Sequence, residues 1–228
     1  MKAMILAAGR GERLRPLTDT LPKPLVSVAG KPLIEYHLEK LAKIGVKEVV
    51  INQAWLGYRL PEILGDGGRW GLQIHYSAEI TALETAGGIK QALPLLGDAP
   101  FLVINGDIFI DELPNISEAY ELMCQGEALA YLWLVDNPHH HPQGDFAISF
   151  GQQLSLADED KLTFSGLGIY HPQLFSTLPE GKQPLGPLLK KNIAQHRVYG
   201  SYFNMFWCDV GTLERLQQLQ VRLLTQSV

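Results

Sequence analysis

The first fifty residues constrain the fold most, because strand-like and helix-like segments alternate there. Residues 4–8 (MILAA) form a short apolar run that stops at Gly9, which is typical of a strand buried on both faces. A polar loop follows, and the apolar spacing of residues 32–44, with Gly45 just beyond, predicts a helix. Residues 46–51 (VKEVVI) predict the next strand. This succession indicates a parallel sheet and an α/β fold.

The alternation continues to about residue 135 and then changes character. After a break at NPHHHPQGD, residues 146–170 predict short strands with turns, a small meander laid beside the parallel sheet. Residues 212–226 predict a final helix with leucines at 213, 216, 219 and 223 on one stripe. The further strands are expected at 73–77, 101–104 and 128–135, and the further helices at 85–96 and 116–126.

Charge and cysteine content exclude several classes of protein. The net charge of −5 argues against general nucleic-acid binding, so the cations gathered between residues 10 and 23 indicate a small anionic ligand. Cys124 and Cys208 lie far apart without the paired spacing of a metal or redox motif, which fits a reducing cytosol. No apolar stretch approaches the roughly 20 residues that span a bilayer. We therefore expect a cytoplasmic protein with neither nucleic-acid nor membrane partners.

The loop after the first strand has the glycines of a phosphate-binding turn. Gly9 and Gly11 let a backbone approach a phosphate closely. The dinucleotide fingerprint does not fit, because Leu14 replaces its third glycine and Asn52 its acidic residue. The Walker loop does not fit either, since its helix would have to begin much earlier. Arg10, Arg13, Arg15 and Lys23 are equally compatible by composition with a solvated loop and with a polyphosphate cradle.

The order of the residues is more specific than their composition. The stretch LAAGRGERLRPLTDTLPKPLVSVAGKPLI resembles the signature of the sugar-nucleotide pyrophosphorylases, which join a nucleoside triphosphate to a sugar 1-phosphate. Further matches run along nearly the whole chain: LETAGGI at 83–89, NGD at 105–107, TFSGLGIY at 163–170 and CDVGTLERL at 208–216.

The resemblance implies a fold and a domain organisation. The fold is a Rossmann-like α/β nucleotidyltransferase sandwich, with a mostly parallel sheet and a small added β-meander. A single domain then covers residues 1–228, with a nucleotide-binding part up to about residue 110 and a sugar-binding part over about 111–228.

The resemblance also implies roles for individual residues. Arg13 would stabilise the leaving pyrophosphate, and Lys23 would neutralise charge at the α-phosphate and the sugar phosphate, which makes both catalytic. The implied nucleotide-binding residues are Ala8, Gly9, Gly11, Glu12, Arg13, Lys23, Thr85 and Gly88.

Two aspartates resemble the magnesium pair of the family. Asp107 ends a predicted strand and Asp209 precedes the last helix. An isolated aspartate after a strand is more often a turn or cap residue, whereas Mg²⁺ needs only one or two carboxylates besides substrate phosphates. Membership of both in family motifs favours the magnesium site.

The sugar side is less defined by sequence. The implied sugar-binding residues are Gly144, Asp145, Glu159 and Gly166. Either Glu159 or Lys161 could replace the E-K-P motif of relatives, and the two stay open. Histidines 139–141 predict a solvated loop or a pocket rim, because adjacent histidines point in different directions.

The resulting hypothesis is an Mg²⁺-dependent nucleotidyltransferase that uses UTP and a sugar 1-phosphate. A related enzyme acting on glucose 1-phosphate with dTTP or UTP, or on mannose 1-phosphate with GTP, is the alternative. A non-catalytic nucleotide-sensing subunit is less favoured, because binding alone would not need Arg13, Lys23, Asp107 and Asp209 together.

Overall fold

A computed structural model describes residues 1–157 and 159–226, and the chain divides into two compact units. The glycine-loop unit contains residues 2–82, 104–112 and the chain from residue 206. The second unit is named the β8 unit after its strand β8 (Ala130–Val135), and it contains Met1 and residues 83–103, 113–157 and 159–205. The sequence-based division near residue 110 concerned binding roles and stays a prediction.

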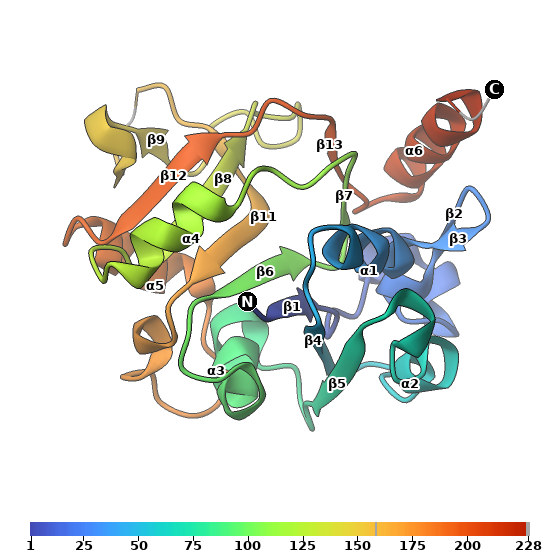
Figure 1. The fold of residues 1–228 in the computed structure, drawn as a ribbon. Coiled ribbons are helices and arrows are strands. Elements are labelled where there is room, and N and C mark those ends of the chain that lie inside the picture. The colour runs from blue at the N-terminus through green and yellow to red at the C-terminus, as the bar shows by residue number, and fades with distance from the viewer. Residues whose placement is uncertain (158, 227–228) are drawn as a thin grey trace. The chain divides into compact units, whose positions relative to one another are not determined.

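The glycine-loop unit is built on three parallel strands, visible in Figure 1. They are β1 (Ala3–Leu6), β4 (Glu48–Gln53) and β5 (Gln73–Ala78), with β4 in the middle. Helix α1 (Leu33–Lys43) forms where its apolar spacing predicts, and its apolar stripe is buried. The strand–helix–strand prediction for the first fifty residues is confirmed.

A two-stranded antiparallel ribbon in the same unit begins directly after Asp107 and ends with Asp209. It pairs β7 (Ile108–Ile110) with β13 (Trp207–Asp209), and helix α6 (Leu213–Gln226) follows at once. Leu216 and Leu219 of α6 are buried in a cluster that contains Phe109 of β7. Leu223 packs against this cluster, whereas Leu213, on the same predicted stripe, is 38% exposed.

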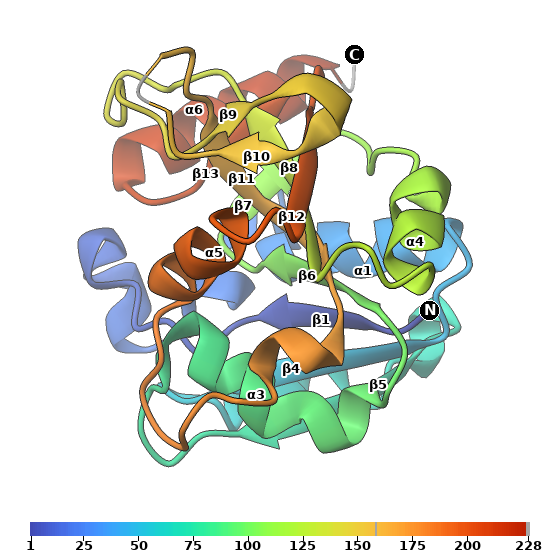
Figure 2. The same ribbon diagram turned by 90° about the vertical axis from the view of Figure 1, so that its left-hand side faces the viewer.

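The β8 unit has a mixed sheet, drawn in Figure 2. Strand β8 (Ala130–Val135) lies between β11 (Thr163–Tyr170), to which it is antiparallel, and β12 (Val198–Tyr202), to which it is parallel. Strands β9 (Ala147–Ile148) and β10 (Leu154–Ser155) form a small antiparallel ribbon. The predicted meander is therefore confirmed for this ribbon, whereas β11 belongs to the sheet through its pairing with β8 and is buried along nearly its whole length.

The remaining elements complete the two units. The other strands are β2 (Ser27–Val28), β3 (Lys31–Pro32) and β6 (Phe101–Asn105), and the other α-helices are α2 (Arg59–Leu64), α3 (Glu84–Leu96), α4 (Ser117–Cys124) and α5 (Leu185–Ile193). The 3-10 helices span Glu12–Leu14, Leu17–Asp19, Lys23–Leu25, Gly68–Trp70, Phe150–Gln152 and Pro172–Phe175.

Candidate active site

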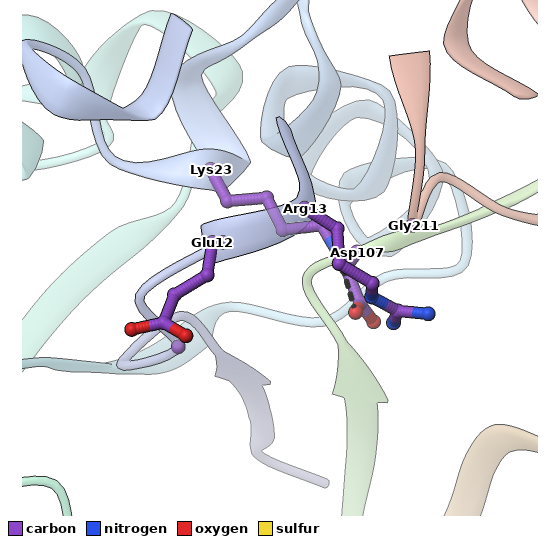
Figure 3. A pocket seen from close by; sticks show the side chains of 7 residues that line it. Glu12, Arg13, Lys23, Asp107 and Gly211 are labelled. Carbon is purple, nitrogen blue, oxygen red and sulfur yellow. Dashed lines mark hydrogen bonds and ion pairs between the residues drawn. The ribbon is translucent and has the colours of Figure 1, made fainter. Parts of the chain in front are cut away.

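A cavity of about 440 Å³ lies within the glycine-loop unit (Figure 3). The residues that line it come from three stretches far apart in the chain: the loop after β1, the start of β7, and the turn before α6. They are Gly9, Gly11, Glu12, Arg13, Lys23, Asp107 and Gly211. Most of the residues that the sequence assigned to the triphosphate thus face one cavity.

The backbone of the loop requires glycine at position 11. Gly11 has a φ of 65°, and a Cβ there would lie 2.9 Å from Cγ2 of Thr18 and 3.0 Å from Cβ of Lys23. Its carbonyl accepts hydrogen bonds from the Leu14 amide at 2.9 Å and the Thr18 hydroxyl at 2.8 Å. Leu14 is fully buried, so the position that failed the dinucleotide fingerprint is a core position of this loop.

Lys23 lines the cavity, and its ammonium group is paired with Asp107. Pro22 and Pro24 flank it and fix much of the local backbone. Its side chain is only 10% exposed, and its Nζ donates to Oδ2 of Asp107 at 2.7 Å. In Figure 3 Lys23 reaches Asp107, while the carboxylate of Glu12 points away from this pair.

The ribbon of β7 and β13 brings Asp107 and Asp209 to the same end. Asp209 pairs in register with Ile108, and the Val210 amide donates to the carbonyl of Asp107 at 2.7 Å. Gly106 passes so close to β1 that a Cβ would lie 2.6 Å from the Leu6 carbonyl oxygen. A glycine before Asp107 is therefore needed for the ribbon to start beside the glycine loop.

Arginines converge on the turn that contains Gly211. A Cβ on Gly211 would collide with Nη2 of Arg215 and would lie 3.1 Å from Oδ2 of Asp209 and 3.2 Å from Nη2 of Arg13. Nη2 of Arg215 forms an ion pair with Oδ2 of Asp209 at 3.1 Å, and the Arg215 side chain is 15% exposed. Arg13 and Asp209 thus face the same small volume, which the absent side chain of Gly211 leaves open.

The two aspartates fit a divalent cation. Asp107 and Asp209 supply carboxylate oxygens, the ligands that Mg²⁺ prefers. Among residues 1–157 and 159–226, no group of three or more His, Cys, Asp or Glu side chains could hold a metal ion. Lys23 and Arg215 also oppose a bare cation beside these carboxylates. The residues therefore fit an ion shared with the phosphates of a ligand better than one held by protein alone.

A buried histidine supports the start of β7. His37 of α1 is fully buried, and its Nε2–H donates to the carbonyl of Ile108 at 2.9 Å, since a carbonyl can only accept. Burial, aided by the nearby charge of Lys40, lowers the pKa of His37 to about 3. The imidazole is therefore neutral at physiological pH, and it anchors the residue after Asp107 without adding charge.

Polar residues behind the loop were missed by the sequence reasoning. Asn52 and Glu79 are buried; Oδ1 of Asn52 accepts from the Ala7 amide at 2.7 Å, and its Nδ2 donates to Oε1 of Glu79 at 2.6 Å. Thr18, Trp55 and Arg215 also contact the site without having been predicted. Only the ends of the first strands, where ligands collect in parallel sheets, could have directed attention to Asn52.

The predicted base and sugar residues belong to the β8 unit. Thr85 and Gly88 lie near the start of α3, after Glu84, which adopts a positive φ of 59°. The carboxylate of Asp145 accepts from the Phe164 amide at 2.8 Å and lies 3.1 Å from Nε2 of His141. Asp145 therefore links the start of β11 to the loop that contains His141 within this unit.

The other predicted sugar residues occupy different environments in the same unit. Gly144 has a φ of 62°, and a Cβ there would lie 2.8 Å from the Lys161 carbonyl oxygen. Gly166 is buried in β11 with a φ of 84°, and Glu159 is exposed. Their assignment to the sugar stays a prediction.

Comparison with known proteins decides the family. Residues 2–150 match the family model described as nucleotidyl transferase. The chain belongs to the nucleotidyl transferase family. It is 50% identical to the N-acetylmuramate alpha-1-phosphate uridylyltransferase of Neisseria meningitidis serogroup B, over 96% of this chain and 97% of that protein. It is 34% identical to the enzyme of the same name from Caulobacter vibrioides, over 97% and 96% of the two chains.

A solved structure supports the fold independently of sequence. A protein of Bacillus anthracis, assigned as a glucose-1-phosphate thymidylyltransferase, matches with a TM-score of 0.83 at 20% identity, over 97% of this chain and 94% of that chain. The predicted family, the α/β nucleotidyltransferase fold and the assignment as a nucleotidyltransferase enzyme are confirmed. None of the helices in the described parts of the chain is both long and apolar enough to cross a membrane.

Proposed function

We propose that this nucleotidyl transferase moves a uridylyl group from UTP to N-acetylmuramate 1-phosphate, giving UDP-N-acetylmuramic acid and pyrophosphate. The observation that carries the proposal is the 50% identity, over nearly the full length of both chains, to a relative named for that reaction. The segments NGDIFID, NPHHHPQGDF and LTFSGLGIYHP also resemble such enzymes. Such an activity would serve peptidoglycan recycling in the cytoplasm.

The reaction needs charge stabilisation more than proton transfer. An oxygen of the sugar 1-phosphate attacks the α-phosphorus of UTP, and the bond from that phosphorus to the bridging oxygen of the β-phosphate breaks. A phosphate monoester already carries about two negative charges at neutral pH, so no base has to activate it. Two anions must nevertheless meet, and positioned cations lower that barrier.

Lys23 and Arg13 are suited to the two ends of the breaking bond. Lys23 and Asp107 both line the cavity, and Nζ of Lys23 lies beside Asp107, where it would neutralise the α-phosphate and the attacking phosphate. Nη2 of Arg13 lies near Asp209, close to the position that a Cβ on Gly211 would take. There it would stabilise the leaving pyrophosphate. The amides of the glycine turn would add donors for the phosphates.

The Lys23–Asp107 ion pair prepares the site before substrate arrives. The short contact and the buried stem keep Nζ in one place, so little order remains to be gained when phosphates bind. Asp107 is 42% exposed, so its carboxylate is open to solvent on the cavity side. Bound phosphates would compete with Asp107 for Lys23.

Asp107 and Asp209 would hold Mg²⁺ in this proposal. When bound, such an ion would offset charge on the phosphate oxygens of the nucleotide. The residues proposed for base recognition are Thr85 and Gly88, and those proposed for the sugar are Gly144, Asp145, Glu159 and Gly166.

A substrate matrix tests the proposal. Pyrophosphate release would be measured with Mg²⁺ for UTP, dTTP and GTP, each crossed with the 1-phosphates of N-acetylmuramate, N-acetylglucosamine, glucose and mannose. We expect rapid release only for UTP with N-acetylmuramate 1-phosphate. Preference for another pair would overturn the substrate and keep the reaction. Binding of UTP without release for any pair would instead indicate a nucleotide-sensing subunit.

A further inference from the structure

Trp55 lies in the loop that follows β4, directly beside the glycine loop that follows β1. Strands β1 and β4 are parallel neighbours, with Leu6 opposite Asn52, so both loops leave the sheet at the same end. Trp55 is half-buried, and it has no place in the mechanism above. Its two contacts with the glycine loop are of different chemical kinds.

The first contact fixes the loop backbone. Nε1–H of Trp55 donates to the carbonyl of Thr18 at 3.0 Å. Thr18 is 1% exposed, and its hydroxyl donates to the carbonyl of Gly11 at 2.8 Å. Two hydrogen bonds, both made by Thr18, therefore join Trp55 to Gly11, one of the glycines that line the cavity. Both hydrogen bonds are partly buried, and breaking them would leave polar groups without partners, so they favour one conformation of the loop.

The second contact places a cation. Cζ of Arg10 lies 4.5 Å from the centre of the Trp55 ring, within the range of a cation–π interaction. Arg10 stands between Gly9 and Gly11, which both line the cavity. Its side chain is 53% exposed, and its nearest ion-pair partner, Glu12, is 3.8 Å away. The indole thus gives the guanidinium a defined place beside the loop whose glycines line the cavity.

We propose that Trp55 is a positioning residue for the triphosphate: its N–H fixes the glycine loop and its ring holds Arg10 beside the phosphate site. This inference rests on the proposed function, because it requires a nucleoside triphosphate as ligand. A guanidinium can stack on an aromatic face and still donate its N–H groups. Arg10 therefore donates charge-assisted hydrogen bonds to the phosphates while it stays over the indole.

Steady-state kinetics separate positioning from general stability. Trp55→Phe keeps a ring and loses the N–H, and we expect about a threefold rise in the KM for UTP. Trp55→Leu loses both contacts, and we expect about a tenfold rise. The KM for the sugar 1-phosphate should change by less than about twofold, because the contacts concern the triphosphate loop alone.

Trp70 provides a matched control. Cζ of Arg69 lies 3.9 Å from its ring centre, and Arg69 pairs with Glu35 at 2.7 Å, away from the residues that line the cavity. Trp70→Leu therefore removes a similar aromatic–arginine contact, and Trp70→Phe keeps a ring, as at position 55. We expect both KM values to stay at the wild-type level in both variants. A fall in melting temperature without a KM change would mark a purely structural effect.

Fluorescence supplies a readout that a structural role would not move. Adding UTP with Mg²⁺ should change the emission of the wild type and of Trp70→Phe, because the cation over the Trp55 ring then binds a phosphate. The change should be largely absent from Trp55→Phe. Arg10→Met should raise the KM for UTP in the wild type and have a smaller effect in Trp55→Leu, since the two residues act together.

The outcomes distinguish this inference from the proposed function. If calorimetry shows that the wild type does not bind UTP with Mg²⁺, the proposed function and the positioning role of Trp55 are both refuted. If the wild type binds and turns over UTP while the Trp55 variants keep the wild-type KM and emission change, only the positioning role is refuted. Equal changes in both KM values for Trp55→Leu would also overturn it.

Discussion

Replacing Lys23 with methionine is the most direct perturbation of the proposed chemistry. Methionine keeps the buried aliphatic stem, which matters because the Lys23 side chain is 10% exposed. It removes the charge that lies 2.7 Å from Oδ2 of Asp107. A unit charge about 4 Å from a phosphate charge contributes about 4 kcal/mol at an effective dielectric constant near 20. If that interaction is realised in the transition state, kcat/KM should fall about a thousandfold.

The stability of the Lys23→Met variant should change far less than its activity. Asp107 is 42% exposed, so solvent can hydrate its carboxylate once the ion pair is gone. Loss of a partly exposed ion pair costs about 1 kcal/mol or less. Thermal unfolding followed by circular dichroism should therefore show a shift of only a few degrees, roughly 2–4 °C.

A second ion pair of the same length provides the control. Nζ of Lys31 lies 2.7 Å from Oε1 of Glu39 on the surface of the glycine-loop unit, and neither residue lines the cavity. Lys31→Met should keep wild-type kinetics in the pyrophosphate-release assay. A kcat/KM for Lys23→Met within tenfold of the wild type would refute the catalytic role of this lysine, and an equal loss in Lys31→Met would refute the electrostatic reasoning.

Three further expectations follow from individual contacts. Gly211→Ala places a Cβ against Nη2 of Arg215 and near Asp209. We expect about a hundredfold loss of kcat with an unchanged circular dichroism spectrum. Normal turnover would show that this Cβ does not displace the neighbouring charged groups. Asp209→Asn removes a proposed metal carboxylate, so kcat should fall about a hundredfold and the Mg²⁺ concentration for half-maximal rate should rise; an unchanged Mg²⁺ titration would refute the metal role. Burial lowers the pKa of Lys40 to about 8 from 10.5. Below that pH the lysine is charged in both the folded and the unfolded state, and the folded state bears the desolvation penalty, which fades as pH rises from about 8 toward 10.5. Between pH 7 and pH 9.5 the wild type should therefore gain about 2 kcal/mol of unfolding free energy relative to Lys40→Met in urea titrations; a constant difference would contradict the lowered pKa.

Much of the fold followed from local sequence patterns. The apolar run that ends at Gly9, the helix over 32–44 and the strand that follows were all predictable, because burial and backbone preference act within a few residues. The pairing of strand β11 could not be predicted from such local patterns. It pairs with β8, from which more than twenty residues separate it in the chain. The hydrophobic pattern of a segment does not specify which other strand it will pair with.

The site shows the same division between local and long-range information. The glycine turn and its cations could be recognised in sequence because they are contiguous, and the positive φ of Gly11 agrees with that expectation. Asn52, Trp55 and Arg215 could not be recognised, because their significance arises from contacts with residues that are distant in the chain.

The sequence by itself determined the family and the strand–loop–helix order, and it showed the group of cations that we propose for the triphosphate. Only the tertiary structure decided that Lys23, 84 residues away from Asp107 in the chain, would place its Nζ on that carboxylate. Only it decided that the β7–β13 register would set Asp107 and Asp209 at one end of a ribbon. The physical reason is that a residue's type and near neighbours specify its backbone and its burial, whereas the charge it faces is specified by whichever strand packs beside it.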